Sequence, residues 1–225
     1  GRKEYNNERD YDGNWGIWDE PFLQYTATRI NTIPQPFFVT FLTLSSHPPY
    51  KVPESYKDIL PGGDLPVYQA VAYTDMSLRR FFETASAMPW FRNTLFVLTP
   101  DHCSPVSGQE YYQHHMGRYA IPIIYFAPGD TMLRGSFEAV TQQIDILPSV
   151  LDYLGYEKPF YALGNTIFRE NAQRYTINYN SNHYQWLSGG FLLKTDETTA
   201  KSLYAFPADS LCRNNLLPEA QHNAG

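Results

Sequence analysis

Residues 95–102 read LFVLTPDH, and this stretch decides the fold class. Residues 95–99 form a short, almost wholly apolar run, which predicts a strand buried on both faces, as in a parallel sheet. Residues 37–44 (FFVTFLTL) and 121–126 (IPIIYF) have the same character. Together with the helical sequence around them, these strands predict an α/β fold with a largely parallel sheet flanked by helices.

Three segments around these strands repeat apolar side chains at three- and four-residue steps, which is the pattern of helices: residues 20–30, 65–85 and 145–154. Asp19 and Asp64 stand where the N-caps of the first two belong. For the long second helix the spacing predicts a buried stripe of eight residues. They are Leu65, Tyr68, Val71, Ala72, Asp75, Leu78, Phe82 and Ala85.

Beyond residue 170 the pattern changes to short runs of β-forming residues, separated by Asn-Ser-Asn, Gly-Gly and Asp-Glu turns. Such runs predict a small antiparallel β meander. We therefore divide the chain into residues 1–170, the α/β portion, and residues 171–225. The second part is either a small subdomain or an extension of the main sheet.

The composition excludes several classes of protein. Hydrophobic residues make up 43% of the chain and aromatic residues 16%, which is ample material for a packed core and argues against disorder. The net charge is −6 with no basic run, so we expect no binding to nucleic acid. No apolar stretch approaches the ~20 residues of a membrane span. Two cysteines are too few for a disulfide scaffold, and they do not indicate whether the protein works in an oxidising or a reducing compartment.

Histidines gather where the predicted strands end, which is where open parallel sheets bind ligands. His47 lies three residues beyond the first strand, Asp101 and His102 follow the second, and His114 and His115 lie before the third. One carboxylate and up to four imidazoles could thus share one rim, a ligand set that suits zinc, manganese or iron. The alternative is that each is an ordinary solvated or hydrogen-bonded loop histidine.

Several segments resemble the sulfatase and alkaline phosphatase superfamily. Residues 93–102 (NTLFVLTPDH) resemble its segment of Asn-Thr, an apolar strand and Asp-His-Gly. Further segments of this chain resemble segments typical of the lipoteichoic acid synthase-like branch, and they occur in the same order along most of the chain. They are residues 15–20 (WGIWDE), 36–50 (PFFVTFLTLSSHPPY), 73–82 (YTDMSLRRFF), 121–129 (IPIIYFAPG), 144–149 (IDILPS) and 203–216.

The resemblance implies an alkaline phosphatase-like fold and a role for each residue at the predicted rim. Asp101 and His102 would bind a catalytic divalent metal, which could be Zn, Mn, Mg or Ca. His47 would bind the substrate or a second metal, joined by His115, or by His114 if the loop is shifted by one residue. The activity implied is hydrolysis or transfer of a sulfate or phosphate ester, as in sulfatases and in phosphoglycerol or phosphoethanolamine transferases.

The chain also departs from this family. The family's nucleophile (a Thr, a Ser or a modified Cys) and an acidic metal ligand belong to an N-terminal half, and neither motif is present in these residues. Residues 103–107 (CSPVS) partly imitate the sulfatase C-x-P-x-R signature, but they lack the Arg and follow the Asp-His pair. Cys103 is therefore either a catalytic cysteine or a replacement for the usual glycine.

Because the chain starts at Gly1 and lacks the nucleophile, we expect it to be the C-terminal portion of a catalytic domain, inactive when isolated. The resemblance implies an extracytoplasmic, periplasmic or cell-surface domain of a bacterial membrane protein, anchored through an upstream segment. Its substrate would be a lipid- or glycan-linked ester. Two alternatives are a non-catalytic module that binds cell-surface glycans or lipid head groups, and a purely structural domain with incidental histidines.

Overall fold

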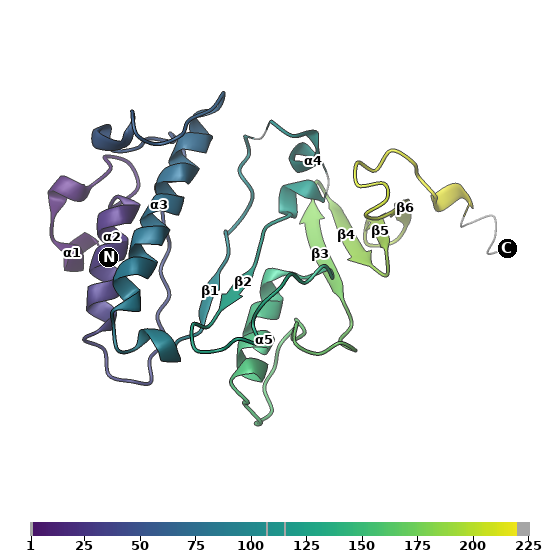
Figure 1. Ribbon diagram of the computed structural model, residues 1–225. Helices are drawn as coiled ribbons and strands as arrows, with labels where there is room; N and C mark the ends of the chain where they lie inside the picture. Colours follow the sequence, from purple (N-terminus) through teal and green to yellow (C-terminus); the bar gives the residue numbers. More distant parts are fainter. Residues whose placement is uncertain (1, 107, 115, 220–225) are drawn as a thin grey trace. The chain divides into compact units, whose positions relative to one another are not determined.

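The computed structural model describes residues 2–106, 108–114 and 116–219 (Figure 1). The chain forms two compact units, each built from separate stretches of sequence. The first unit comprises Gly1–Val97 and Ile124–Leu133, and the second comprises Leu98–Ile123 and Arg134–Gly225. The division at residue 170 that the sequence suggested stays a prediction.

The first unit is built around two helices that pack side by side (Figure 1). Its core combines Leu23, Ala27 and Ile30 of one helix with Phe81 and Ala85 of the other, closed by the buried ring of Trp90. The elements of this unit are α1 (Arg2–Tyr5), η1 (Glu8–Asp10), α2 (Asp19–Ile30), η2 (Glu54–Tyr56), α3 (Pro66–Ser86), η3 (Phe91–Asn93), β1 (Phe96–Leu98), which runs into the second unit, and β2 (Ile124–Phe126).

Helix α3 confirms the predicted helix, and its predicted buried face is confirmed only in part: Ala85 is buried, and Leu78 and Phe82 are partly buried against the core. The buried residues of α3 are Val67, Ala70, Tyr73, Ser77, Phe81 and Ala85. Tyr68 and Val71 of the predicted stripe are exposed instead. Apolar residues occur on more than one side of this helix. The buried side carries the small residues Ala70 and Ser77, which allow a neighbouring element to pack closely against the helix.

Both predicted N-caps are wrong. The residue before α2 is Trp18 and the residue before α3 is Leu65, and neither caps its helix with a side-chain hydrogen bond. Asp19 is the first residue of α2 and is completely buried. Its Oδ1 accepts hydrogen bonds from the backbone N–H of Leu44 at 2.8 Å and of Ser45 at 3.0 Å, and its Oδ2 accepts one from Thr74 Oγ1 at 2.7 Å. Asp19 therefore ties α2 to α3 and to the segment that precedes His47.

The strands of the first unit are shorter than the sequence suggested. β1 and β2 pair in a two-stranded sheet, and each covers three residues. Their expected burial on both faces is wrong: β1 is only partly buried, and Ile124 and Phe126 of β2 are exposed. Residues 37–44, expected as a strand buried on both faces, belong to no strand, and Phe38 and Leu42 are exposed. The expected strand is therefore wrong as regards pairing and burial, because no other described segment supplies a backbone edge for it.

The second unit contains the predicted antiparallel meander as a four-stranded sheet in the order β3-β4-β5-β6. The strands are β3 (Tyr175–Asn180), β4 (His183–Ser188), β5 (Phe191–Thr195) and β6 (Ala200–Ala205), with Ile177 opposite Trp186 and Leu187 opposite Leu192. Leu187 and Leu192 form the core of this unit with Met116. The remaining elements are α4 (Glu110–Gln113), η4 (Gly117–Tyr119), η5 (Gln143–Asp145) and α5 (Ile146–Tyr153), and α5 confirms the third predicted helix.

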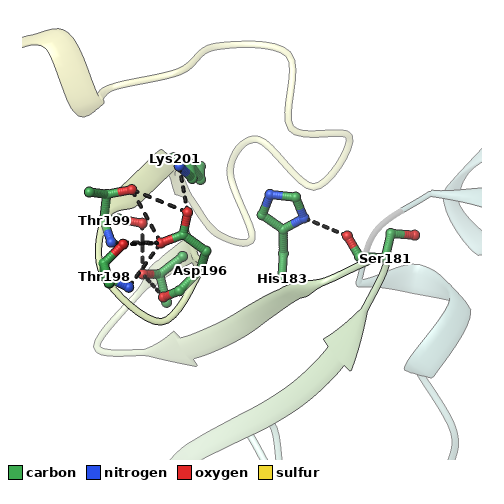
Figure 2. Close-up of polar contacts among 7 residues, drawn as sticks. Ser181, His183, Asp196, Thr198, Thr199 and Lys201 are labelled. Carbon is green, nitrogen blue, oxygen red and sulfur yellow. Dashed lines mark hydrogen bonds and ion pairs between the residues drawn. The ribbon is translucent and has the colours of Figure 1, made fainter.

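The turn between β5 and β6 is organised by one carboxylate. Asp196 Oδ1 accepts hydrogen bonds from the backbone N–H of Thr198 at 2.9 Å and of Thr199 at 2.7 Å, and Oδ2 lies 2.6 Å from Lys201 Nζ (Figure 2). The hydrogen bond to Lys201 and those from the turn hold the pKa of Asp196 well below its usual range. These contacts favour the ionised carboxyl, so they stabilise the turn only while Asp196 carries its charge.

We expect Asp196→Asn to lower the melting temperature at pH 7, and the difference from wild type to shrink in acid. A carboxyl whose folded pKa is depressed adds stability above its unfolded pKa of about 3.9, and this stability is lost as the pH falls from there through the folded pKa. Thermal melts between pH 7 and pH 2.5 measure the effect. Glu197→Gln, which removes the same charge from an exposed position in this turn, serves as the control. A difference that does not change with pH would contradict the assignment.

Candidate metal and anion site

The Asp101–His102 pair lies in the second unit, just after β1. Asp101 Oδ2 is 3.6 Å from His102 Nε2, and both side chains are 63% exposed. Asp101 Oδ1 accepts the backbone N–H of His102 at 2.9 Å. Two ligands about 2.1 Å from one tetrahedral ion lie about 3.4 Å apart, so the Oδ2–Nε2 separation fits shared coordination of a divalent metal.

A backbone carbonyl selects the tautomer of His102. Nδ1 of His102 lies 2.8 Å from the carbonyl oxygen of Cys103. A carbonyl can only accept a hydrogen bond, so in the neutral ring Nδ1 carries the proton and Nε2 keeps its lone pair. Histidines that bind metals are oriented in this way, through a hydrogen bond from the ring nitrogen that does not coordinate. The nitrogen facing Asp101 is thus the one that can bind a metal.

Gln143 forms hydrogen bonds with the backbone that carries the Asp101–His102 pair, and the sequence did not predict this role. Its Nε2 donates to the carbonyl oxygen of Pro100 at 2.9 Å and to that of Asp101 at 3.1 Å. Gln143 belongs to η5, about forty residues further along the chain but in the same unit. No sequence pattern marks a glutamine that donates to backbone carbonyls, because the contact depends on where the two loops meet.

His47 lies in the first unit and is oriented by two contacts. Its Nδ1 is 3.2 Å from the carbonyl oxygen of Pro48, which also accepts a hydrogen bond from Trp15 Nε1 at 2.6 Å. The Trp15 and His47 rings lie 4.0 Å apart between centroids, tilted by 54°. The carbonyl again places the proton on Nδ1, so Nε2 of His47 can bind an anion or a metal. Trp15 was missed as a partner of this histidine.

His114 and His115 are the two remaining residues of the predicted site. His115 lies outside the described residues. His114 follows α4, and its Nε2 lies 3.5 Å from Oε1 of Glu110, which also pairs with Arg213 at 3.1 Å. Among residues 2–106, 108–114 and 116–219, no three His, Cys, Asp or Glu side chains form a group that could hold a metal. The structure thus brings together Asp101 and His102 of the five predicted residues.

Cys103 has the surroundings of a structural thiol. Its Sγ donates to the carbonyl oxygen of Ala120 at 2.9 Å, and burial raises the pKa of the Cys103 thiol. A nucleophilic cysteine needs the opposite, namely a depressed pKa beside a cation or a helix N-terminus. This geometry favours the interpretation that Cys103 replaces a glycine.

We expect Cys103 to react with a thiol reagent such as DTNB at least about tenfold more slowly in the folded chain than in urea, because only the thiolate attacks. The rate is measured at pH 7.5 in a Cys212→Ser background, so that Cys103 is the only thiol that can react. A folded-state rate equal to or above the unfolded rate would restore Cys103 as a candidate nucleophile.

The described residues contain no helix that is both long and apolar enough to span a bilayer.

Comparison with known proteins assigns the family. The family model described as Sulfatase matches residues 1–156. Lipoteichoic acid synthase 2 of Bacillus subtilis (strain 168) is 24% identical over 238 residues, covering 94% of this chain and 36% of the synthase. The chain therefore spans about a third of the length of that relative.

Two solved structures share the fold. A protein of the alkaline phosphatase superfamily from Vibrio parahaemolyticus has a TM-score of 0.79 at 21% identity and covers 96% of this chain and 53% of its own. The lipoteichoic acid synthase LtaP from Listeria monocytogenes has a TM-score of 0.74 at 19% identity, with 98% of this chain and 58% of its own covered. The predicted α/β fold is thus confirmed as that of the alkaline phosphatase superfamily, and the match over residues 1–156 means that the chain belongs to the sulfatase family.

Proposed function

We propose that this chain is part of a metal-dependent enzyme that hydrolyses or transfers a sulfate or phosphate ester. The observation that carries the proposal is the exposed Asp101–His102 pair, whose Oδ2 and Nε2 lie 3.6 Å apart, with the proton of His102 held on Nδ1. Family membership supports the same class of reaction. Sulfate and phosphate esters remain equal candidates for the substrate.

Each residue has a distinct task in this proposal. Asp101 and His102 hold the divalent cation, and Gln143 fixes the loop that carries them. The cation, when bound, polarises the ester oxygen and lowers the pKa of the nucleophile. Nε2 of His47 contacts the tetrahedral anion, together with His115 or His114. The nucleophile, which forms a covalent intermediate with the transferred group, comes from polypeptide outside these 225 residues.

Two relatives suggest where the protein works. Lipoteichoic acid synthase 2 and LtaP are both named as lipoteichoic acid synthases. We propose by analogy a lipid- or glycan-linked ester as substrate. We also propose an extracytoplasmic domain attached to a bacterial membrane through polypeptide outside this chain.

Turnover by the full-length gene product tests the proposal. The assay uses p-nitrophenyl phosphate, bis-p-nitrophenyl phosphate and p-nitrophenyl sulfate, with Mn²⁺ or Zn²⁺ present or after treatment with EDTA. We expect metal-dependent hydrolysis of at least one ester, and none by the 225-residue chain alone. Metal-independent turnover would overturn the metal role. Binding of inorganic phosphate without turnover of any ester would favour a non-catalytic module for anionic head groups or glycans.

A further inference from the structure

Trp15 is exposed to solvent and yet fixed in orientation. The residue is 53% exposed, but its one polar side-chain group, the indole N–H, donates to the carbonyl oxygen of Pro48 at 2.6 Å. The indole lies against the ring of His47, with 4.0 Å between the ring centroids and a tilt of 54°. Two contacts of different kinds therefore hold the indole in one position beside the imidazole.

The backbone of Trp15 is held by a turn that one carboxylate closes. Asp12 Oδ1 accepts hydrogen bonds from three backbone N–H groups. The donors are Asn14 at 2.7 Å, Trp15 at 2.8 Å and Gly16 at 3.1 Å. The backbone N–H of Asp12 in turn donates to the carbonyl oxygen of Gly16 at 2.8 Å. Aspartate side chains that accept from the backbone in this way stabilise turns, so the position of Trp15 is set before any ligand binds.

This turn lies directly against the segment that leads to His47. A Cβ atom at Gly16 would lie 2.9 Å from Leu44 Cδ1, which is closer than two carbon atoms approach, so the Leu44 side chain packs against bare backbone. The carbonyl oxygen of Leu44 accepts the backbone N–H of His47 at 3.1 Å. The loops that carry Trp15 and His47 thus touch at two places, Gly16 with Leu44 and Trp15 with Pro48.

The carbonyl oxygen of Pro48 serves both side chains at once. It accepts from Trp15 Nε1 at 2.6 Å and lies 3.2 Å from His47 Nδ1, and a carbonyl oxygen has two lone pairs for two donors. With Nδ1 on this oxygen and the indole against the ring, the imidazole keeps one orientation, and Nε2 lies on the side away from the carbonyl. Orientation matters for a group that contacts a reacting anion, because a misplacement of about 1 Å can cost about 10²-fold in rate.

We propose that Trp15 is a positioning residue for the anion contact of His47, and that the turn closed by Asp12 holds Trp15 for this task. Trp15 acts through the His47 ring and does not itself touch the transferred group. As regards catalysis, this role rests on the proposed function. The orientation of the His47 ring, by contrast, is a property of the folded chain and does not depend on the reaction.

A double-mutant cycle in the full-length gene product tests whether Trp15 acts through His47. We expect Trp15→Ala to lower kcat/KM for a p-nitrophenyl ester by about 10- to 100-fold, as for side chains that orient a ligating histidine. In a His47→Ala background the same substitution should change kcat/KM by less than about twofold, because the residue through which Trp15 acts is gone. An equal loss in both backgrounds would overturn the proposal.

Three single variants separate the contacts of Trp15. Trp15→Phe keeps an aromatic ring but not the N–H, so we expect a smaller loss than with Trp15→Ala. Asp12→Ala removes the acceptor of the turn and should act in the same direction. Tyr68→Ala removes another aromatic ring of the first unit, 44% exposed, and should leave kcat/KM unchanged. A Tyr68→Ala loss as large as that of Trp15→Ala would contradict a specific role for Trp15.

NMR of the full-length product labelled with ¹⁵N-histidine observes the His47 ring directly. The spectra are recorded at pH 8.5, above the pKa of an unperturbed histidine, without substrate and in EDTA so that no metal selects a nitrogen. The signal missing from His47→Ala identifies the ring. We expect the proton on Nδ1 in wild type and both tautomers in Trp15→Ala, where the ring is free to turn.

The NMR result separates this proposal from the proposed function. The same single tautomer in wild type and in Trp15→Ala would overturn the positioning role, whatever the activity. A change of tautomer in a protein that turns over no ester would contradict the proposed function and leave the orientation of His47 by Trp15 standing.

Discussion

Replacing Asp101 by asparagine in the full-length gene product is expected to reduce kcat/KM for the proposed ester substrate by about 10³-fold. The substitution keeps the size of the side chain but removes the negative charge that faces His102 Nε2 across 3.6 Å. A neutral amide is a poor ligand for zinc or manganese, and loss of a metal that stabilises several kcal/mol of charge corresponds to this factor. Steady-state kinetics and titration calorimetry with Mn²⁺ and Zn²⁺ measure the two consequences.

Asp75→Asn is the control for this experiment. Asp75 lies on α3 with a 73% exposed side chain and pairs only weakly with Arg79, at 3.5 Å. The same chemical change there should leave metal affinity and kcat/KM unchanged. If Asp101→Asn binds metal and turns over substrate as wild type does, the Asp101–His102 pair is not the metal site.

The largest expected effect on stability comes from Asp19→Ala. The substitution removes the acceptor for the backbone N–H of Leu44 and Ser45 and for the hydroxyl of Thr74, inside a completely buried site. Breaking a buried network of this kind costs about 3–5 kcal/mol of unfolding free energy. For a chain of this length that corresponds to a fall of about 10 °C in melting temperature. Urea and thermal unfolding of the 225-residue chain measure it.

Two further variants make this result specific to the buried carboxylate. Asp75→Ala removes an exposed carboxylate from α3 and should change stability by less than about 0.5 kcal/mol. Asp19→Asn keeps an oxygen for the two backbone N–H groups but sets an amide group against Thr74, so we expect an intermediate loss. An Asp19→Ala variant as stable as wild type would show that the network is dispensable.

Helix α3 shows which features of a helix a periodic sequence pattern can predict. Its length was anticipated to within a residue at each end, because a long amphipathic repeat is a local property of the chain. The buried face was anticipated only in part, because Tyr68 and Val71 compete with Val67 and Ala70 for it. Which stripe is buried depends on close packing with α2, and that depends on residues elsewhere in the chain.

Residues 37–44 illustrate a second limit. Their apolar character indicated a strand, but whether a strand forms depends on a hydrogen-bonding partner, which the residues themselves cannot supply. The meander was predictable by contrast, because each of its strands pairs with the next one along the chain. Adjacent pairing needs only short turns, and the Gly-Gly and Asn-Ser-Asn signals mark them.

The sequence by itself indicated the family, the three longest helices, the antiparallel meander and the position of Asp101 and His102 after a strand. These follow from motif order and local periodicity, which each stretch of chain carries within itself. The tertiary structure decided which groups are available for chemistry. It placed Gln143 beneath the Asp101 loop, set the Trp15 ring against His47, and showed that Asp19 anchors the backbone instead of capping a helix. Such roles arise from contacts between residues 25 to 42 positions apart, and no local pattern records the distance between two groups that only folding brings together.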